Sequence, residues 1–191
     1  MRQRLPVRML RAATVCCVLA CLLVPPLAAE EAPSESQVKA AFLFNFVKFI
    51  EWPADSFREN GGRMRLCVLG DGPLRPELER VAGGKTVNGH LLEVARVSAG
   101  DDLAHCRMLF VTATPGGALR KGLADLRNAP VLTVGESAEF TRQGGMIRFL
   151  MLDNRVRFEI NVAAAEQAGL KISSKLLALA QNLRGGQAGG G

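Results

Sequence analysis

The chain has few of the residues from which enzymes build catalytic centres. It contains no tyrosine, one tryptophan and two histidines among 191 residues. His90 and His105 have no further metal ligand at suitable spacing beside them except Cys106, and no G-x-S-x-G motif marks a nucleophile. Gly84-Lys85-Thr86 resembles the end of a phosphate-binding loop, but Glu79 stands where that loop requires its first glycine. We therefore expect a protein that is not an enzyme and holds no metal or cofactor.

The chain also lacks an apolar run long enough to span a bilayer as a helix. The longest run, Ala12 to Leu23, has roughly 12 residues where about 20 are needed. Four arginines precede it, and Pro25-Pro26 and Ala28-Ala29 follow it. This order predicts a signal peptide over residues 1–29, cleaved after Ala29, and export to a bacterial periplasm. The alternative is a lipid anchor on Cys21, within Val18-Leu19-Ala20-Cys21.

Excess positive charge is scarce once the leader is set aside. Residues 1–29 carry four of the 24 Lys and Arg and none of the 18 Asp and Glu, so the rest has a net charge of 20 minus 18, or +2. No basic cluster is evident in that remainder. A nucleic-acid partner is therefore not expected.

Cysteine is equally sparse in the expected mature chain. Cys16, Cys17 and Cys21 belong to the leader, which leaves Cys67 and Cys106. Two thiols in an oxidising compartment indicate one disulfide, and closing a loop of about 40 residues contributes roughly 4 kcal/mol on the chain-entropy model. The alternative is two buried free thiols.

Helical and strand patterns alternate along residues 30–184, which we take as one domain. Ser34 and Gln37 form a capping box before an unusually apolar helix, Val38 to Trp52, that Pro53 ends. Further helices are expected at 73–82 and 117–127, and strands at 64–69, 91–97, 108–112 and 131–134. This order predicts a single-domain α/β fold, a three-layer sandwich around a mixed, mostly parallel sheet.

The C-terminal part predicts an antiparallel addition to that sheet. Strands at 146–151 and 155–160 flank the turn Asp153-Asn154, as in a hairpin. Helices are expected at 163–168, with Gly169 after its end, and at 174–183. The Gly-rich tail, 185–191, has too little apolar surface to fold.

Two surfaces are candidates for binding. Loops after three strands could line one crevice at the carboxyl edge of the sheet, and its candidate ligand residues are Asp71, Gly72, Gly116 and Ser137. A C-terminal surface would present Glu159, Asn161, Lys171, Ser173 and Lys175 to a partner. Ordinary capping and amphipathic packing is the alternative explanation of the second set.

Several segments, in order, resemble the YfiR-like family of exported bacterial proteins. The resemblance covers about residues 35–183 and rests on these segments: Lys39-Ala-Ala-Phe-Leu-Phe-Asn-Phe-Val-Lys-Phe-Ile-Glu-Trp-Pro53, Cys67-Val-Leu-Gly-Asp71, Gly84-Lys-Thr-Val-Asn-Gly-His90, Cys106-Arg-Met-Leu-Phe110, Gly144-Gly-Met-Ile147, Arg157-Phe-Glu-Ile-Asn161 and Gly169-Leu-Lys-Ile-Ser-Ser-Lys175.

The resemblance implies a periplasmic regulator that represses an inner-membrane diguanylate cyclase by binding its periplasmic portion, and so lowers cyclic-di-GMP. It also implies a dimer and sensitivity to redox state through cysteines. Gly145 and Leu152 depart from the family pattern, because they stand where a second cysteine pair is expected. A redox switch would therefore depend on Cys67 and Cys106 alone. A periplasmic sensor for a small ligand, bound in the crevice, is the alternative function.

Overall fold

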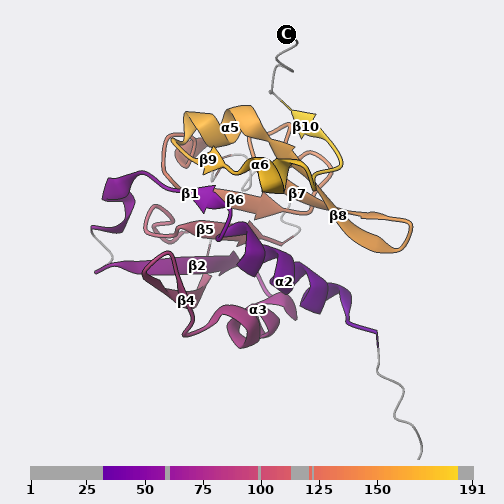
Figure 1. Ribbon diagram of the computed structural model, residues 1–191, viewed down its shortest axis with the longest axis horizontal. Helices are drawn as coiled ribbons and strands as arrows, with labels where there is room; N and C mark the ends of the chain where they lie inside the picture. Colours follow the sequence, from indigo (N-terminus) through magenta and orange to yellow (C-terminus); the bar gives the residue numbers. More distant parts are fainter. Residues whose placement is uncertain (1–31, 59–60, 99, 113–120, 122, 185–191) are drawn as a thin grey trace, which may run out of the picture. The chain divides into compact units, whose positions relative to one another are not determined.

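A computed structural model describes residues 32–58, 61–98, 100–112, 121 and 123–184 (Figure 1). All of these except Ala32 belong to one compact unit, Pro33–Gly191. The leader expected at 1–29, the tail at 185–191 and most of the helix expected at 117–127 lie outside the described residues.

Five parallel strands form the centre of the sheet. In chain order they are β2 (Arg63–Leu69), β4 (His90–Val97), β5 (Met108–Val111), β6 (Leu132–Gly135) and β7 (Ile147–Leu152). In space they lie in the order β4-β2-β5-β6-β7. All residues of β5 and β6 are buried, as continuous apolar runs in a sheet covered on both faces require. The predicted single-domain α/β fold with a mostly parallel sheet is confirmed.

Antiparallel strands extend this sheet at both edges. β3 (Thr86–Val87) pairs with β4 through the turn Asn88-Gly89, and β8 (Arg155–Asn161) pairs with β7 through Asp153-Asn154. All four turn residues have positive φ, which a tight two-residue hairpin of this type requires. The predicted C-terminal hairpin is thus confirmed. A short strand, β10 (Leu183–Arg184), then pairs in parallel with β8.

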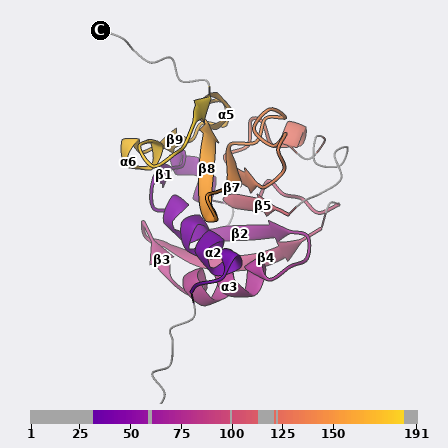
Figure 2. The same cartoon turned by 90° about the vertical axis from the view of Figure 1, so that its right-hand side faces the viewer.

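Two helices, α2 (Glu35–Phe46) and α3 (Leu74–Ala82), pack side by side (Figures 1 and 2). The predicted capping box is present at the start of α2, where the Ser34 hydroxyl accepts from the backbone N–H of Gln37. Buried residues of both helices join one apolar cluster with the strands. Within the described ranges, no helix is sufficiently long and apolar to cross a membrane.

The first helix is shorter at its C-terminal end than the sequence predicts. It ends at Phe46 rather than at Trp52, because the chain turns there and becomes a strand. This strand, β1 (Ile50–Glu51), pairs antiparallel with β9 (Lys171–Ile172), and the backbone N–H of Ser173 donates to the carbonyl of Phe49. Pairing with a segment about 120 residues later therefore overrides the local helical pattern. After β1, the 3₁₀ turn η1 (Ala54–Phe57) leads towards β2.

The last helix is also shorter than predicted. α5 (Val162–Gln167) matches its expected range closely, but α6 (Ser174–Leu177) forms one turn and does not continue to Leu183. The backbone N–H of Gln181 donates to the carbonyl of Phe158, and that of Ile160 donates to the carbonyl of Asn182. Backbone hydrogen bonds to the edge of β8 therefore replace those of the expected helix, and the end of this segment forms β10.

A second, smaller apolar cluster is present. Along β5, its residues alternate with residues of the first cluster. Leu109 and Val111 of β5 belong to it, whereas Met108 and Phe110 belong to the first cluster. Since successive side chains of a strand point to opposite faces, the two clusters lie on opposite faces of the sheet. Leu123 and Leu126, from the part of the expected 117–127 helix that is described, also belong to the second cluster.

Candidate functional site

A cavity of about 590 Å³ lies where β2, β5 and β6 end. Its walls come from the start of α2, the loop that joins β2 to α3, the end of β5 and Glu136 directly after β6. The order in which strands are added to the sheet reverses here, since β4, which follows β2 in the chain, lies on one side of β2 and β5 lies on the other. In open α/β sheets, ligands bind outside the carboxyl ends of the strands at such a switch point. We call this cavity the switch-point crevice.

Lys39 is the most constrained charged side chain of the switch-point crevice. Its ammonium donates to Glu136 Oε1 at 2.6 Å and forms an ion pair with Glu35, one helical turn earlier. The Lys39 side chain is only 12% exposed. Burial lowers the pKa of Lys39, but hydrogen bonds and attraction from Glu136 and Glu35 outweigh it and raise the pKa above the ordinary value. Lys39 thus remains charged and ties α2 to the sheet edge.

The structure places two of the four predicted ligand residues in this crevice. Asp71 and Gly72 line it, and Asp71 Oδ1 is 2.7 Å from a guanidinium nitrogen of Arg96. Ser137 follows the lining residue Glu136 but is not itself part of the wall, and Gly116 lies outside the described residues.

Sequence reasoning missed the contribution of α2 to the crevice. Ligands of an α/β sheet are expected in loops that follow strands, whereas Glu35 and Lys39 belong to the helix that precedes the sheet. Their spacing of four residues at the start of a capped helix is the pattern that could have indicated an ion pair. Which strand end this pair approaches depends on the fold.

Two of the predicted partner-binding residues are engaged inside the domain. Glu159 is 4% exposed, accepts from the Thr141 hydroxyl and pairs with Arg148, whose Nε lies 3.1 Å from Glu159 Oε1. Asn161 donates to the carbonyl of Thr141 at 3.0 Å, and its side-chain oxygen caps α5 by accepting from the N–H of Ala164 at 3.1 Å. These contacts join the hairpin to the loop before it and leave Glu159 with almost no surface.

The other three predicted residues lie together on β9 and α6. Ser173 caps α6, because its hydroxyl accepts from the backbone N–H of Lys175 at 3.2 Å. Lys171 and Lys175 are exposed. Leu179, which follows α6, is 63% exposed, the largest value among the large apolar side chains described as exposed. We call Lys171, Lys175 and Leu179 the β9–α6 surface.

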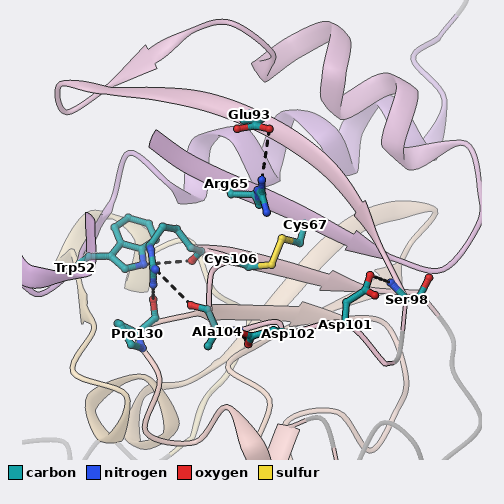
Figure 3. The surroundings of a disulfide bond; sticks show 11 residues. Trp52, Arg65, Cys67, Glu93, Ser98, Asp101, Asp102, Ala104, Cys106 and Pro130 are labelled. Atoms are coloured by element: carbon teal, nitrogen blue, oxygen red, sulfur yellow. Dashed lines mark hydrogen bonds and ion pairs between the residues drawn. A yellow bond between two sulfur atoms is a disulfide. The ribbon is translucent and has the colours of Figure 1, made fainter. Parts of the chain in front are cut away.

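Cys67 and Cys106 form a disulfide between β2 and the segment that enters β5 (Figure 3). Their Cα atoms are 5.9 Å apart, and the two residues are 0% and 1% exposed. Trp52 Nε1 donates to the nearby carbonyl of Arg107 at 3.2 Å, and the buried Arg107 guanidinium donates to the carbonyls of Ala104 and Pro130. The predicted pairing is confirmed. Its burial makes the bond part of the core, out of direct reach of an external thiol.

The two histidines take part in local structure. His90 Nδ1 lies 2.8 Å from the carbonyl of Gly62, and its ring stacks on Phe57 with centroids 3.7 Å apart. His105 Nε2 lies 3.1 Å from Asp102 Oδ2. Across the part of the chain that the structure describes, no three His, Cys, Asp or Glu side chains gather as metal ligands.

Fold and site together define a single-domain α/β protein with a parallel centre to its sheet, a buried disulfide and a crevice at the switch point. The chain belongs to the YfiR/HmsC-like family, whose model matches residues 36–181. This family is regulatory rather than catalytic, and its members are periplasmic. A comparison with curated proteins finds no match.

Two of the sequence segments that carry the family resemblance meet in the structure. Ile50 and Glu51, near the end of the first segment, pair with Ile172 and Lys171 of the last. In addition, a Cβ placed on Gly169 would approach Pro53 Cγ to 3.3 Å, and Gly169 has a positive φ of 74°. A glycine therefore suits this position for two separate reasons.

Proposed function

We propose that this protein is a periplasmic regulator that represses an inner-membrane diguanylate cyclase by binding the periplasmic portion of that enzyme. Membership of the YfiR/HmsC-like family over residues 36–181 is the observation that carries the proposal. The expected leader, residues 1–29, would bring the domain to the compartment in which such a portion is accessible.

The β9–α6 surface is the docking site that we propose for the cyclase. It combines an exposed apolar side chain, Leu179, with two exposed ammonium groups, Lys171 and Lys175. β9 is anchored by its pairing with β1, and α6 by the buried side chain of Leu176, so these groups are held on ordered elements. Such a surface fits a partner that offers an apolar contact with carboxylates around it.

Glu159 and Asn161 support this surface from within. Asn161 caps α5, and α5 leads through Gly169 into β9. Glu159 accepts from the hydroxyl of Thr141 and pairs with Arg148, and the carbonyl of the same Thr141 accepts from Asn161. In this proposal the two residues position the docking elements, and only Lys171, Lys175 and Leu179 touch the partner.

Repression requires that the protein distinguish two states of the cyclase. A regulator with equal affinity for both states shifts nothing, however tightly it binds. Moving the enzyme from 99% active to 99% inactive takes a preference of about 10⁴-fold for the inactive state. The protein therefore has to contact a part of the cyclase that changes on activation.

Deleting the gene tests the proposal, and cyclic-di-GMP is the quantity to measure. We expect cyclic-di-GMP to rise in the deletion strain and to return to its original level when the wild-type gene is restored. An unchanged level in a strain that expresses the partner cyclase contradicts the proposal.

Charge reversal tests the docking surface. The double variant Lys171→Glu, Lys175→Glu should accumulate normally but fail to restore repression and fail to co-purify with the cyclase. Arg75→Glu is the matched control, since Arg75 is an exposed residue of α3, away from β9 and α6 (Figure 1). Repression by the double variant at the control's level would remove the β9–α6 surface from the proposal.

A further inference from the structure

We propose that the switch-point crevice binds a small organic cation with an apolar stem. The inference does not depend on the proposed function, because it rests on the crevice and its charges alone. The position of the crevice, outside the carboxyl ends of β2 and β5, is where the topology of an α/β sheet leaves room for a ligand. A volume of about 590 Å³ is within the usual range of small-molecule sites.

The charges that face the crevice favour a cation. Among the lining residues that the structure describes, three are carboxylates, Glu35, Asp71 and Glu136, and one is basic, Lys39. Arg96, outside the wall, neutralises part of Asp71. Over these described residues, with both cations counted, one negative charge remains, and binding an ammonium group offsets it.

Lys39 itself demonstrates the kind of group that these carboxylates hold. Its primary ammonium is 2.6 Å from Glu136 Oε1 and also pairs with Glu35. The side chains of Glu136 and Glu35 are 31% and 52% exposed, so Lys39 does not enclose either of them completely. A ligand amine would thus make the same type of charge-assisted hydrogen bond that Lys39 makes.

An anion is the less suitable occupant, although the start of α2 also borders the crevice. Free backbone N–H groups at a helix start attract anions. Here the capping box already uses them in part, because Ser34 Oγ accepts from Gln37 N and Gln37 Oε1 accepts from Ser34 N at 3.0 Å. A ligand anion would in addition lie beside three carboxylates.

The apolar part of the crevice wall is the reason why we expect the ligand to carry an apolar stem. Phe110 and Leu74 are 1% and 5% exposed, and both line the crevice. A short methylene chain would therefore lie on apolar surface while its ammonium group reaches the carboxylates.

Isothermal titration calorimetry of the purified protein with 1,5-diaminopentane tests the inference. Pentane-1,5-diol, glutarate and inorganic phosphate are the comparison probes, because the first two keep the length of the stem and change its end groups. We expect saturable binding of the diamine and no binding of the other three.

Three substitutions separate a role in ligand binding from a purely structural role. They are expected to change the affinity for the diamine in opposite directions, which a loss of structure would not do. Lys39→Met removes the competing ammonium, so it should tighten diamine binding at least about threefold, whereas Glu136→Gln should weaken it about tenfold. Glu35→Gln, at a more exposed position, should weaken it less and decides the question if Glu136→Gln does not fold. Glu77→Gln on α3 is the matched control, since Glu77 pairs with Arg80 outside the crevice.

Two results would overturn the inference. The first is no heat of binding with the diamine at roughly 10 mM, which is ten times a dissociation constant of 1 mM. The second is binding of glutarate or phosphate that Lys39→Met abolishes, which would make the crevice an anion site. Neither result bears on the cyclic-di-GMP phenotype of the deletion strain, so the two proposals fail separately.

Discussion

The two faces of the sheet differ in what covers them, although the same strands supply both. On one face, side chains such as Leu66 and Phe110 belong to one apolar cluster with the buried residues of α2 and α3. On the other, Cys67 and Leu109 belong to a smaller cluster that contains the disulfide. We call them the helix face and the disulfide face. The difference indicates that packing stabilises one face and a covalent bond supplements packing on the other.

Phenylalanine rings make up much of the helix face. Phe46 of α2 lies 5.0 Å from Phe158 and 5.7 Å from Phe149, measured between ring centroids. Phe42 is 5.5 Å from Phe158 and 6.1 Å from Phe149. These distances are in the range of favourable ring contacts, so α2 is fixed to the hairpin β7–β8 by aromatic packing.

The disulfide face is more polar over the same hairpin. Glu159, Arg148 and Thr141 form their hydrogen-bonded network on the strand side opposite to Phe158. The hydroxyl of Thr133 on β6 accepts from the backbone N–H of Met146. Buried polar contacts of this kind specify an arrangement but add little net stability, which leaves more of the stability to the disulfide.

Among substitutions on the two faces of the sheet, Phe46→Ala should have the largest effect on the free energy of unfolding. Truncating a buried phenylalanine typically costs about 3–5 kcal/mol, and Phe46 is 1% exposed among three other rings. Urea unfolding measures the change in the free energy of unfolding. Leu179→Ala, at a 63% exposed position, is the control and should change it by less than about 0.5 kcal/mol. A loss below about 1 kcal/mol for Phe46→Ala would show that the helix face does not depend on this packing.

Removing the disulfide tests the other face and should have the second largest effect. Cys67 and Cys106 are 39 residues apart, and the double variant Cys67→Ala, Cys106→Ala should lose about 2–4 kcal/mol. The same urea titration measures it, and wild-type protein reduced while unfolded is the control. A loss greater than that of Phe46→Ala would reverse our ranking of the two faces.

Free-thiol labelling addresses the same bond. In protein denatured without a reductant, neither Cys67 nor Cys106 should react, because both sulfur atoms are in the bond. Stoichiometric labelling of both residues would show that they are free thiols in the purified protein.

The central strands were predictable from sequence because the signals for them are local. β5 and β6 are short apolar runs between turn residues, and the hairpin β7–β8 has alternating residues around Asp153-Asn154. The strands that sequence reasoning missed have two residues each and exist through distant partners, as β1 does through β9. β3 is an exception, since Asn88-Gly89 is a hairpin signal that could have found it.

The candidate sites were predictable to a smaller extent. The rule that strand ends share one edge found Asp71 and Gly72, but it could not bring in Lys39 from a helix earlier in the chain. The alternating pattern of β8 suggested that Glu159 is exposed. In the structure, Thr141 from the preceding loop and Arg148 from β7 enclose its carboxylate, a contact between segments that no periodicity reports.

The smallest predicted effect concerns the edge of the helix face, where Lys39 ties α2 to Glu136. The folded protein raises the pKa of Lys39 above its ordinary value of 10.5, so this contact contributes stability in full below the unfolded-state pKa. That contribution is lost as pH rises through the higher, folded-state pKa. Wild-type protein should therefore lose more stability between about pH 8 and pH 11 than Lys39→Met loses.

Urea midpoints at the two pH values measure this difference, and Lys175→Met, which removes an exposed ammonium instead, is the matched control. The control should keep the pH dependence of the wild type. If Lys39→Met keeps it too, the ion pair contributes nothing to the attachment of α2, and aromatic packing alone holds the helix face. If only Lys39→Met flattens it, the helix that forms one wall of the switch-point crevice is held at that wall by charge, where a cationic ligand would compete with Lys39 for Glu136.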